Sequence, residues 1–444
     1  MKNTKPVLSR RDFLKNAGLA GGLLILPSGF LRGEDAPSNR INYAGIGVGG
    51  MGGGDVSSIS RIQGVQLVGL CDVDKNTLNR SVNGYKGRFP DVKGFADYRE
   101  LLEKLGKSID AVSVSTPDHT HFTAAYTAAD LGKHVYVQKP MCHTVDQVRR
   151  LTAKVKEKGV VSQMGNQGSS SPHTRAAREW YEAGVLGNVT EAVAWSDRPI
   201  WAQGQNAYNA EKPAPGHLAW PLWLGPAPKI AYRDGLHSFS WRGYYEFGCG
   251  ALGDMAIHLM YDPFYALRLT APTKIEVDVS GKSPVAYPKA STVTFHFPAV
   301  GDRGPIKFTW YDGRRKPEAP KGFGLGGNGS IIRGSKVQLN ACGWNGNFQP
   351  YISAEARKAI SVPAKYFRPR GGHYANWVDG IRGKAALSSS FDIAGPFAEV
   401  IILGCMAQRL GRTLNWDAAT GKFVNDDEAN ALLKAPTPTD GFYA

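Results

Sequence analysis

The sequence contains few cysteines and no long apolar run, and each absence excludes a class of protein. Its five cysteines are widely scattered among 444 residues and form neither a C-x-x-C pair nor an even-numbered framework, which excludes a disulfide scaffold and a cysteine-based metal site. No stretch of about 18 uninterrupted apolar residues occurs, so a bundle of membrane-spanning helices is also excluded. With 42% hydrophobic residues the chain can still bury a sizeable core, which excludes disorder as its main state.

The length and the net charge set further limits. A chain of 444 residues is long enough for two or three domains, since domains usually have about 100–200 residues. The formal net charge of +15 first suggests an acidic partner such as nucleic acid. No nucleic-acid-binding motif accompanies this charge, so we expect no nucleic acid partner and no metal ion.

The N-terminal segment, residues 1–36, has the pattern of a targeting signal. Residues 9–15 read SRRDFLK, and a mildly apolar stretch rich in glycine, alanine and leucine follows from Asn16 to Phe30. This resembles a twin-arginine export signal, which implies a periplasmic or otherwise exported protein with no stable membrane span in its mature form. A basic amphipathic helix on the protein's own surface is the alternative, but so glycine-rich a segment packs poorly. No clean cleavage site follows, so removal and retention both stay open.

From Arg40 to about Gln167, short apolar runs alternate with helical patterns. Buried strands are expected at Ile41–Gly47, Val65–Cys71, Ala111–Ser115, His134–Val137 and Val160–Gln163. Helices are expected at Asp55–Ile62, Lys75–Gly84, Tyr98–Leu105, Phe122–Leu131 and Val145–Lys158. Strands separated by helices of this length predict an α/β domain with a doubly wound parallel sheet over residues 37–166.

The pattern changes in residues 167–444. A helix is expected near Pro172–Ala183, a strand near Val189–Trp195, and then a long aromatic loop, Ser196–Phe247. Further elements are expected as a helix from Gly250 to Leu269, strands at Lys274–Val279, Ser291–Phe297, Lys307–Trp310 and Ser330–Leu339, and helices near His373–Arg382 and Pro396–Leu410. This order predicts an α+β domain with an open, mostly antiparallel sheet and helices on one face. Since the other face would be apolar and exposed, we expect a homodimer or homotetramer.

A glycine-rich turn between the first strand and the first helix has the spacing G-x-G-x-x-G. Its five candidate cofactor-binding residues are Gly47, Gly49, Gly50, Met51 and Gly52. Glycines at these positions allow a tight turn, close approach of a pyrophosphate to the backbone, and close packing of helix on strand. Asp72 stands 20 residues after Gly52 at the end of the next strand, where an acid binds ribose hydroxyls and favours NAD over NADP. Asp74 can share this role, and Lys75 weakens the exclusion of NADP.

An NAD site offers another reason for the basic charge, because a positive surface attracts the cofactor's phosphates. Attraction to an anionic envelope surface explains the charge equally well. The alternative for the turn itself is a flexible glycine loop beside an aspartate that caps a helix. The combination of strand, glycines, helix, second strand and acid disfavours that alternative.

Three further motifs follow the glycine-rich turn along the chain. They are Thr116-Pro117-Asp118-His119-Thr120-His121, Gln138-Lys139-Pro140, and Gly250, Asp254 and His258 in the spacing G-x-x-x-D-x-x-x-H. With them the chain resembles the glucose–fructose oxidoreductase / inositol dehydrogenase / MocA (Gfo/Idh/MocA) family over about residues 39–420. Two positions depart from the family pattern, since Asp118 replaces an asparagine and Gln138 replaces a glutamate.

The resemblance implies an NAD-dependent oxidoreductase that acts on the CH–OH groups of a sugar or cyclitol. It adds Thr116, Pro117, Asp118, His121, Gln138 and Lys139 to the candidate cofactor-binding residues. It also implies a cis peptide bond between Lys139 and Pro140.

Lys139, Asp254 and His258 are the candidate catalytic residues. Lys139 ends a buried strand at the carboxyl edge of the sheet, where ligands bind in such folds, and a lysine there can act as an acid or base or polarise a carbonyl. Asp254 and His258 are four residues apart on an expected helix, so the acid can orient the imidazole as a base. The alternatives are a solvated lysine beside a turn and a surface Asp–His pair.

The aromatic loop indicates the class of substrate. Five of the ten tryptophans, Trp195, Trp201, Trp220, Trp223 and Trp241, fall within it or at its edge. Flat rings suit the C–H faces of pyranoses, so Trp201, Trp223 and Tyr245 are candidate carbohydrate-binding residues, with His373 in a glycine-hinged segment that can close over the cleft. A folded-back core or an oligomer interface is an equally good interpretation of the loop. Stacking on nucleic acid is disfavoured because the loop lacks a dense basic stripe.

Export constrains the reaction, because free NAD is scarce outside the cytoplasm. We therefore expect the cofactor to be bound before export and held tightly. The sequence leaves three functions open: a sugar or cyclitol oxidoreductase, a redox-neutral NAD-dependent glycosidase, and a carbohydrate-binding protein without catalysis. The related glycosidases lack the family lysine that this chain keeps as Lys139, which favours dehydrogenase chemistry.

Overall fold

The computed structural model describes residues 40–343 and 348–435. All of its helices and strands belong to the compact unit that begins at Ile41. The predicted twin-arginine signal lies outside the described residues.

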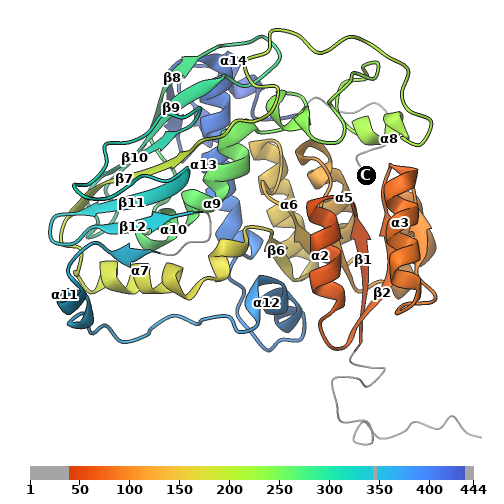
Figure 1. Ribbon diagram of the computed structural model, residues 1–444, viewed down its shortest axis with the longest axis horizontal. Helices are drawn as coiled ribbons and strands as arrows, with labels where there is room; N and C mark the ends of the chain where they lie inside the picture. Colours follow the sequence, from red (N-terminus) through yellow and green to blue (C-terminus); the bar gives the residue numbers. More distant parts are fainter. Residues whose placement is uncertain (1–39, 344–347, 436–444) are drawn as a thin grey trace, which may run out of the picture. The chain divides into compact units, whose positions relative to one another are not determined.

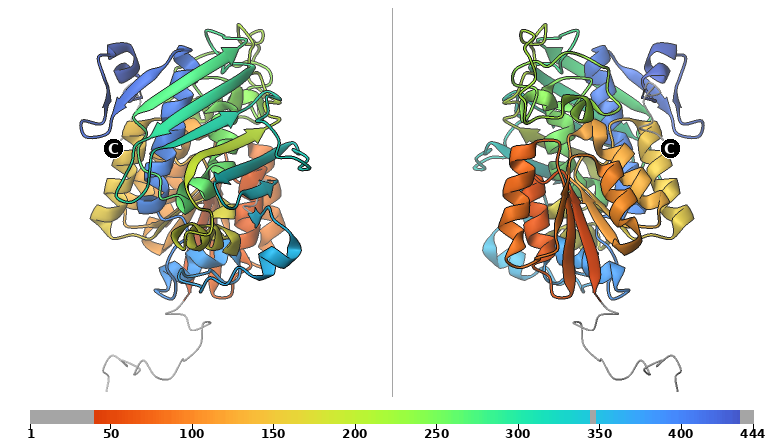
Figure 2. Two further views of the ribbon diagram at one scale, coloured as in Figure 1. Left: turned by 90° about the vertical axis from the view of Figure 1, so that its left-hand side faces the viewer. Right: turned by 90° about the vertical axis from the view of Figure 1, so that its right-hand side faces the viewer.

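The first sheet has six parallel strands flanked by helices, which confirms the predicted doubly wound α/β domain (Figures 1 and 2). Its order β3-β2-β1-β4-β5-β6 is formed by β1 (Ile41–Ile46), β2 (Val65–Cys71), β3 (Lys93–Phe95), β4 (Ala111–Val114), β5 (His134–Val137) and β6 (Ser162–Met164). The helices are α2 (Met51–Ser60), α3 (Lys75–Lys86), α4 (Tyr98–Leu105), α5 (Asp118–Asp130) and α6 (Val145–Lys158). Strand β3 was not expected, because two of its three residues are exposed and it has no apolar run.

The second sheet has nine strands in the order β13-β12-β11-β7-β10-β9-β8-β14-β15. They are β7 (Val189–Ser196), β8 (Lys274–Ser280), β9 (Ala290–Phe297), β10 (Ile306–Tyr311), β11 (Asn328–Gly334), β12 (Leu339–Cys342), β13 (Gln349–Pro350), β14 (Leu414–Asp417) and β15 (Lys422–Phe423). The pair β7 and β10 is parallel and the other pairs are antiparallel, as the α+β prediction requires. The expected strand Ser330–Leu339 is wrong, because the chain turns back between β11 and β12.

The helix expected from Gly250 to Leu269 is also wrong in form. The segment is a π-helical turn, η6 (Leu252–Ala256), followed by the short helices α9 (Ile257–Leu259) and α10 (Tyr261–Ala266). A Cβ at Gly253 would lie 2.1 Å from Cβ of Cys249, so only glycine allows this close wrapping. The consequence is functional, because Asp254 lies inside the π turn, a feature frequent at functional sites.

The outward face of the second sheet is polar, so the expectation of an exposed apolar face is wrong. The outward side chains of its central strands are Lys274, Glu276, Asp278, Thr292, Thr294, His296, Lys307 and Thr309. Its apolar part, Val193, Trp195 and Ile331, is covered by Phe323 and Leu325. The argument for an oligomer from exposed apolar surface therefore falls, and the oligomeric state itself stays a prediction.

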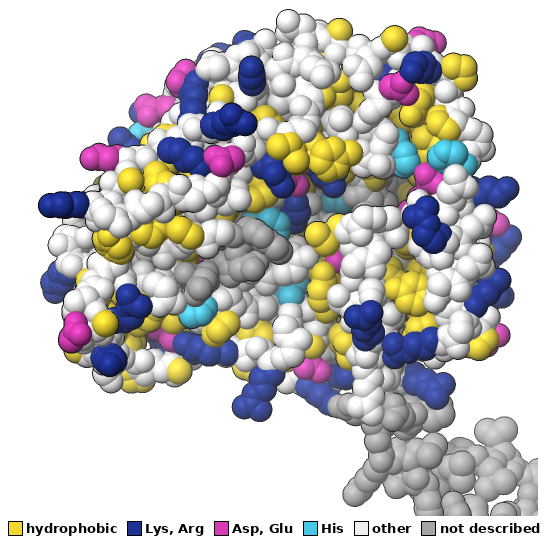
Figure 3. Space-filling view, viewed as in Figure 1, with side chains coloured by type: hydrophobic (Ala, Val, Ile, Leu, Met, Phe, Trp, Pro, Cys, Tyr) yellow, Lys and Arg dark blue, Asp and Glu magenta, His cyan; other side chains and the backbone are white. Residues whose placement is uncertain are grey.

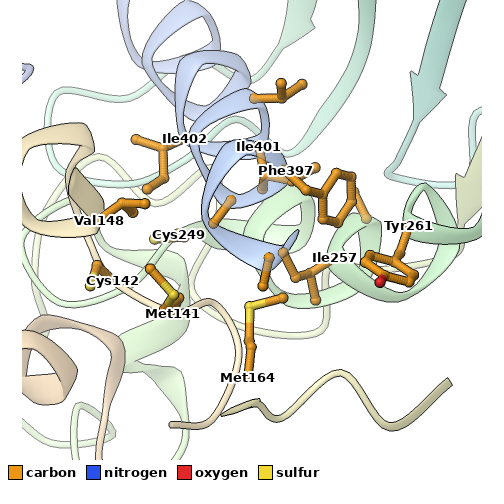
Figure 4. Close-up of a cluster of buried hydrophobic side chains, with 14 of the residues drawn as sticks. Met141, Cys142, Val148, Met164, Cys249, Ile257, Tyr261, Phe397, Ile401 and Ile402 are labelled. Atoms are coloured by element: carbon orange, nitrogen blue, oxygen red, sulfur yellow. The ribbon is translucent and has the colours of Figure 1, made fainter. Parts of the chain in front are cut away.

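Helix α13 (Phe391–Leu410) fills the space between the second sheet and the first domain. It is long and apolar enough to cross a membrane by length and composition, but 78% of its apolar window is buried inside the fold. Figure 4 shows Ile402 of this helix beside Val148, with Met141 and Cys142 in the same buried cluster. The chain that directly follows Lys139 and Pro140 is thus anchored in the core.

The aromatic loop folds on itself and docks on the first domain. Its short helix α8 (Trp220–Leu224) carries the stacked rings of Trp220 and Trp223, whose centroids are 4.6 Å apart. The amide of Ala219 donates to the carbonyl of Val73 at 2.9 Å, and the amide of Lys75 donates to the carbonyl of His217 at 2.8 Å. The loop is therefore fixed to the turn between β2 and α3.

The remaining helices complete the described chain. They are η3 (Gly106–Ser108), η4 (Gln167–Ser170), α7 (Pro172–Glu182), η5 (Ser240–Gly243), α11 (Ala354–Lys358), α12 (Gly372–Ile381) and α14 (Asp427–Ala431). Helices α7, α12 and α13 lie where the sequence pattern expects helices.

Candidate active site

The glycine turn between β1 and α2 forms a cradle that only glycine permits. Gly47 and Gly50 have φ angles of 77° and 51°, in the left-handed region. A Cβ at Gly52 would lie 1.9 Å from the carbonyl oxygen of Gly47. At Gly50 a Cβ would meet no atom within 4 Å, and no side chain caps α2, so its N-terminus is open toward an anion. These residues fit a dinucleotide pyrophosphate, with Gly49 and the half-exposed Met51 in the same turn.

Asp72 and Asp74 have different tasks. The Asp72 carboxylate accepts hydrogen bonds from the amide of Val48 at 2.9 Å and from the amide of Asp74 at 2.9 Å, and burial raises its pKa. Asp74 instead caps α3 by accepting from the amides of Asn76 and Thr77. Asp72 is therefore the acid placed at the glycine turn, where a ribose would lie.

Gln138, which departs from the family glutamate, is paired with Asp55, a residue that sequence reasoning missed. The side-chain amide of Gln138 donates to both carboxylate oxygens of Asp55, at 3.0 and 2.9 Å, and Ser115 and Tyr374 donate to the same carboxylate. A glutamate at position 138 would place two carboxylates together in a buried site. The side-chain oxygen Oε1 of Gln138 also accepts a hydrogen bond from the backbone amide of Lys139 at 3.2 Å, so this network connects Asp55 to the lysine.

Lys139 and Asp254 form a largely buried ion pair. The Lys139 Nζ donates to Oδ1 of Asp254 at 2.6 Å and to its backbone carbonyl at 3.1 Å, and the two side chains are 15% and 16% exposed. Burial acts to raise the pKa of Asp254, but Lys139 outweighs it and lowers the pKa. The bond between Lys139 and Pro140 is cis, as the family resemblance implies.

His258 lies close enough to Lys139 and Asp254 for both charges to affect its pKa. Burial, and to a lesser extent Lys139, lowers its pKa to about 3, while Asp254 acts in the opposite direction. The imidazole is therefore neutral near pH 7, with one ring nitrogen unprotonated. The structure thus brings together all three residues that were predicted as catalytic.

Two charged side chains that the catalytic prediction did not include complete the cluster. Arg242, from the aromatic loop, has its Nε 3.8 Å from Oδ1 of Asp254. Asp118 accepts the amide of Cys249 at 3.0 Å, and burial raises its pKa to about 7 despite the opposing effects of Arg242 and Lys139. No motif in the sequence signals Arg242, since only the folding of the loop brings it here.

His121 connects two of the family motifs. Its ring nitrogens face the carbonyls of Pro140 at 2.7 Å and Thr116 at 2.8 Å, and burial lowers its pKa to about 4. Pro117, directly after Thr116, is the N-cap residue of α5. These contacts hold the Lys139 turn against the end of β4, so the structure gives His121 a positioning role.

The four predicted carbohydrate-binding residues lie in four different environments. Trp201 is partly exposed, with its ring 6.2 Å from that of Phe239. Trp223 is 3% exposed inside the core of the aromatic loop, so its prediction as a stacking surface is corrected.

Tyr245 and His373 are also corrected by their surroundings. Tyr245 lines a cavity of about 430 Å³ whose walls contain none of the catalytic cluster. His373 is buried and its ring nitrogens contact Met164 and Ser170, so it is part of the packing and does not close over the cleft. In the described ranges, no group of three or more His, Cys, Asp or Glu side chains is placed to hold a metal ion.

Family models match both domains. The model described as "Oxidoreductase family, NAD-binding Rossmann fold" matches residues 41–166, and the one described as "Oxidoreductase family, C-terminal alpha/beta domain" matches residues 184–440. The chain belongs to the Gfo/Idh/MocA oxidoreductase family. Its first domain is therefore an NAD-binding domain, and the glycine turn and Asp72 belong to the matched residues.

Individual relatives match shorter segments. A glycosyl hydrolase family 109 protein of Solibacter usitatus is 32% identical over 155 residues, which cover 31% of this chain and 34% of that protein. A levoglucosan dehydrogenase of Pseudarthrobacter phenanthrenivorans is 25% identical over 173 residues, 39% of this chain and 36% of that protein. The matched segments span about a third of these relatives.

The fold agrees with that of a solved relative. A structure of levoglucosan dehydrogenase in complex with NADH and L-sorbose superposes with a TM-score of 0.57 at 14% identity, covering 85% of this chain and 98% of that one. At this identity the likeness shows the fold alone.

Proposed function

We propose that this chain is an exported NAD-dependent oxidoreductase that oxidises or reduces a carbinol carbon of a sugar, glycoside or cyclitol. The observation that carries the proposal is the cluster of Lys139, Asp254 and His258 beside an NAD-binding domain. NAD, when bound, supplies the acceptor or donor of the hydride. The chain's residues must orient the substrate and move the hydroxyl proton.

The cluster can move that proton in either direction. The neutral imidazole of His258 accepts the proton of a substrate hydroxyl as the carbinol becomes a carbonyl, and returns it in the reverse reaction. The Lys139 ammonium, held by Asp254, donates a hydrogen bond to the same substrate oxygen and stabilises its negative charge. Both groups are nearly buried, so water is largely excluded from the proton path.

Tight retention of the cofactor forms part of this proposal. The aromatic loop is hydrogen-bonded to the backbone on both sides of Asp74, next to the acid that faces the ribose. Burial lowers the pKa of His237 in the same loop, and Asp74 and Asp72 lie near enough to oppose that shift. A loop in this position hinders release of the adenosine end, which suits a protein that works where free NAD is scarce.

The relative of glycosyl hydrolase family 109 favours a second candidate. In a redox-neutral cycle the enzyme would oxidise a glycoside, eliminate the aglycone, add water and reduce the product, with no net change of the cofactor. Lys139 favours simple dehydrogenation. Periplasmic localisation and a homodimer or homotetramer complete the proposal as predictions.

The test is purification of the mature protein, release and identification of its nucleotide, and a panel of sugars, glycosides and cyclitols followed at 340 nm. We expect bound NAD and a substrate-dependent absorbance change. Lys139→Ala and His258→Ala should each lower kcat by about 100-fold or more. Lys154→Ala is the matched control, because Lys154 also pairs with an aspartate, at 3.0 Å, and is 14% exposed.

The outcomes separate the candidates. Release of an aglycone without net reduction of NAD would support the glycosidase. Full activity of both cluster variants would overturn the site assignment. Binding of sugars without any turnover would leave a carbohydrate-binding protein.

A further inference from the structure

Arg242 places a second positively charged side chain near Asp254, the acid of the candidate catalytic cluster. Asp254 already has a full partner in Lys139 at 2.6 Å, whereas the guanidinium of Arg242 stays 3.8 Å away. The Nη1 of Arg242 donates to the carbonyl of Phe239 at 3.2 Å. Within residues 40–343 and 348–435, its Nη2 donates to no group. Arg242 therefore keeps hydrogen-bonding capacity at the edge of the cluster.

The charges of the cluster do not balance. Lys139 and Arg242 contribute two positive charges, and Asp254 contributes one negative charge. Asp118 contributes only in part near neutral pH, because burial raises its pKa to about 7 against the opposing effects of Arg242 and Lys139. The two histidines of the cluster are neutral. Figure 3 shows basic and histidine side chains close together in the furrow between the two domains.

An exposed aromatic side chain lies next to Arg242. The Phe239 side chain is 50% exposed, and the Arg242 guanidinium lies 5.5 Å from its ring centre. The Trp201 ring is 6.2 Å from the Phe239 ring on its other side. These are the rings of the aromatic loop that remain open after its core has formed, so they can receive the apolar face of a pyranose.

We propose that Arg242 binds a carboxylate of the substrate, and that the protein acts on an acidic sugar, a uronic acid or its glycoside. This inference rests on the proposed function and specifies its substrate class. A planar guanidinium matches a planar carboxylate, and the unbalanced positive charge is neutralised when that carboxylate binds. Phe239 and Trp201 contact the adjoining C–H face of the ring.

The proposal makes a different prediction from a purely structural role. If Arg242 only positions Asp254, its loss lowers the rate for acidic and neutral sugars by the same factor. If it binds a substrate carboxylate, its loss raises KM for acidic sugars and changes the ratio between the two classes. The ratio of kcat/KM is therefore the decisive measurement.

The experiment uses the NAD-loaded protein and matched pairs: methyl glucuronide with methyl glucoside, and methyl galacturonide with methyl galactoside. We expect at least one pair to show a preference for the acid of about tenfold or more. Arg242→Gln should bring that ratio close to one, mainly through KM, and Arg242→Lys should keep part of the preference. The control is Arg315→Gln, because Arg315 also pairs with an aspartate and is 24% exposed, against 27% for Arg242.

Several outcomes would overturn the inference. One is a preference for neutral sugars in every pair, and another is an equal loss for both classes in Arg242→Gln. A higher kcat/KM for glucose 6-phosphate than for any uronide would mean that Arg242 binds a phosphate group and not a carboxylate. If no sugar of either class is turned over, the proposed function itself fails, which is a distinguishable result. Binding of the uronides to the NAD-loaded variants, measured by calorimetry, gives the same comparison without turnover.

Discussion

The glycine turn of residues 47–52 and the aromatic loop of residues 196–247 lie at the same candidate site but reach it in different ways. The turn is a short local structure: Gly47 and Gly50 are required by their own φ angles, and Gly52 by its contact with the carbonyl of Gly47. The loop depends on packing over more than 50 residues, and most of its rings serve its own core. Local motifs therefore predict their chemistry directly. A high content of aromatic residues in a long loop predicts only that their rings stack, and not whether they stack on each other or on a ligand.

The strongest test of this comparison changes the turn. Gly52→Ala introduces a Cβ that would lie 1.9 Å from the Gly47 carbonyl, so the turn must open. We expect NAD affinity to fall by about 100-fold or more, measured by fluorescence titration of the nucleotide-free protein. Gly54→Ala, in the same helix, meets no atom within 4 Å and should keep NAD binding. Equal effects of the two variants would contradict the local explanation.

The second test changes the core of the loop. Trp223→Ala removes a ring that stacks on Trp220 and also contacts His119 and Phe247. The free energy of unfolding should fall by about 3–5 kcal/mol, measured by urea denaturation. Phe239→Ala, at an exposed ring of the same loop, should change it by less than about 1 kcal/mol. A small effect of Trp223→Ala would contradict the burial of this ring in the core of the loop and would restore it as a candidate carbohydrate-binding residue.

The third and smallest test concerns Asp118, whose ordinary pKa of 3.8 is raised to about 7 by burial. Between about pH 4 and pH 7 the folded chain holds a proton that the unfolded chain has lost, so stability falls as pH rises through this window. Asp118→Asn restores the family residue and removes the titration. We expect wild type to lose about 2 kcal/mol more than the variant between pH 5 and pH 8, measured by urea unfolding.

The control for this third test is Asp278→Asn, since the Asp278 side chain is 78% exposed on the outer face of the second sheet. It should leave the pH dependence of wild type unchanged. Identical pH slopes for wild type and Asp118→Asn would show that the carboxyl of Asp118 is already ionised in the folded protein.

The parts of the fold that the sequence predicts are those with strong local periodicity. The helices Tyr98–Leu105 and Val145–Lys158 have the predicted bounds, because each has a side-chain cap and a regular apolar face. The segment after Gly250 does not, since its π turn depends on the contact between Gly253 and Cys249. The outer face of the second sheet was expected to be apolar, and only the register of the strands shows its polar side chains.

The candidate site divides in the same way. Lys139, Asp254 and His258 could be selected because their motifs resemble those of the family. Asp55 and Arg242 could not, because the first is recognised only through its contact with Gln138 and the second only through its distance from Asp254. Trp223 and Tyr245 were selected wrongly as carbohydrate-binding residues, because their burial depends on how the loop folds.

The attachment of the aromatic loop at two places has a thermodynamic consequence. One part of the loop is bonded to the turn beside the ribose-facing acid, and another part supplies Arg242 to the catalytic acid. If occupancy of either place orders the loop, linkage requires that substrate raises the affinity for NAD by the same factor by which NAD raises the affinity for substrate. Such a protein would hold its cofactor most firmly while it is working, and would exchange it only when it is idle.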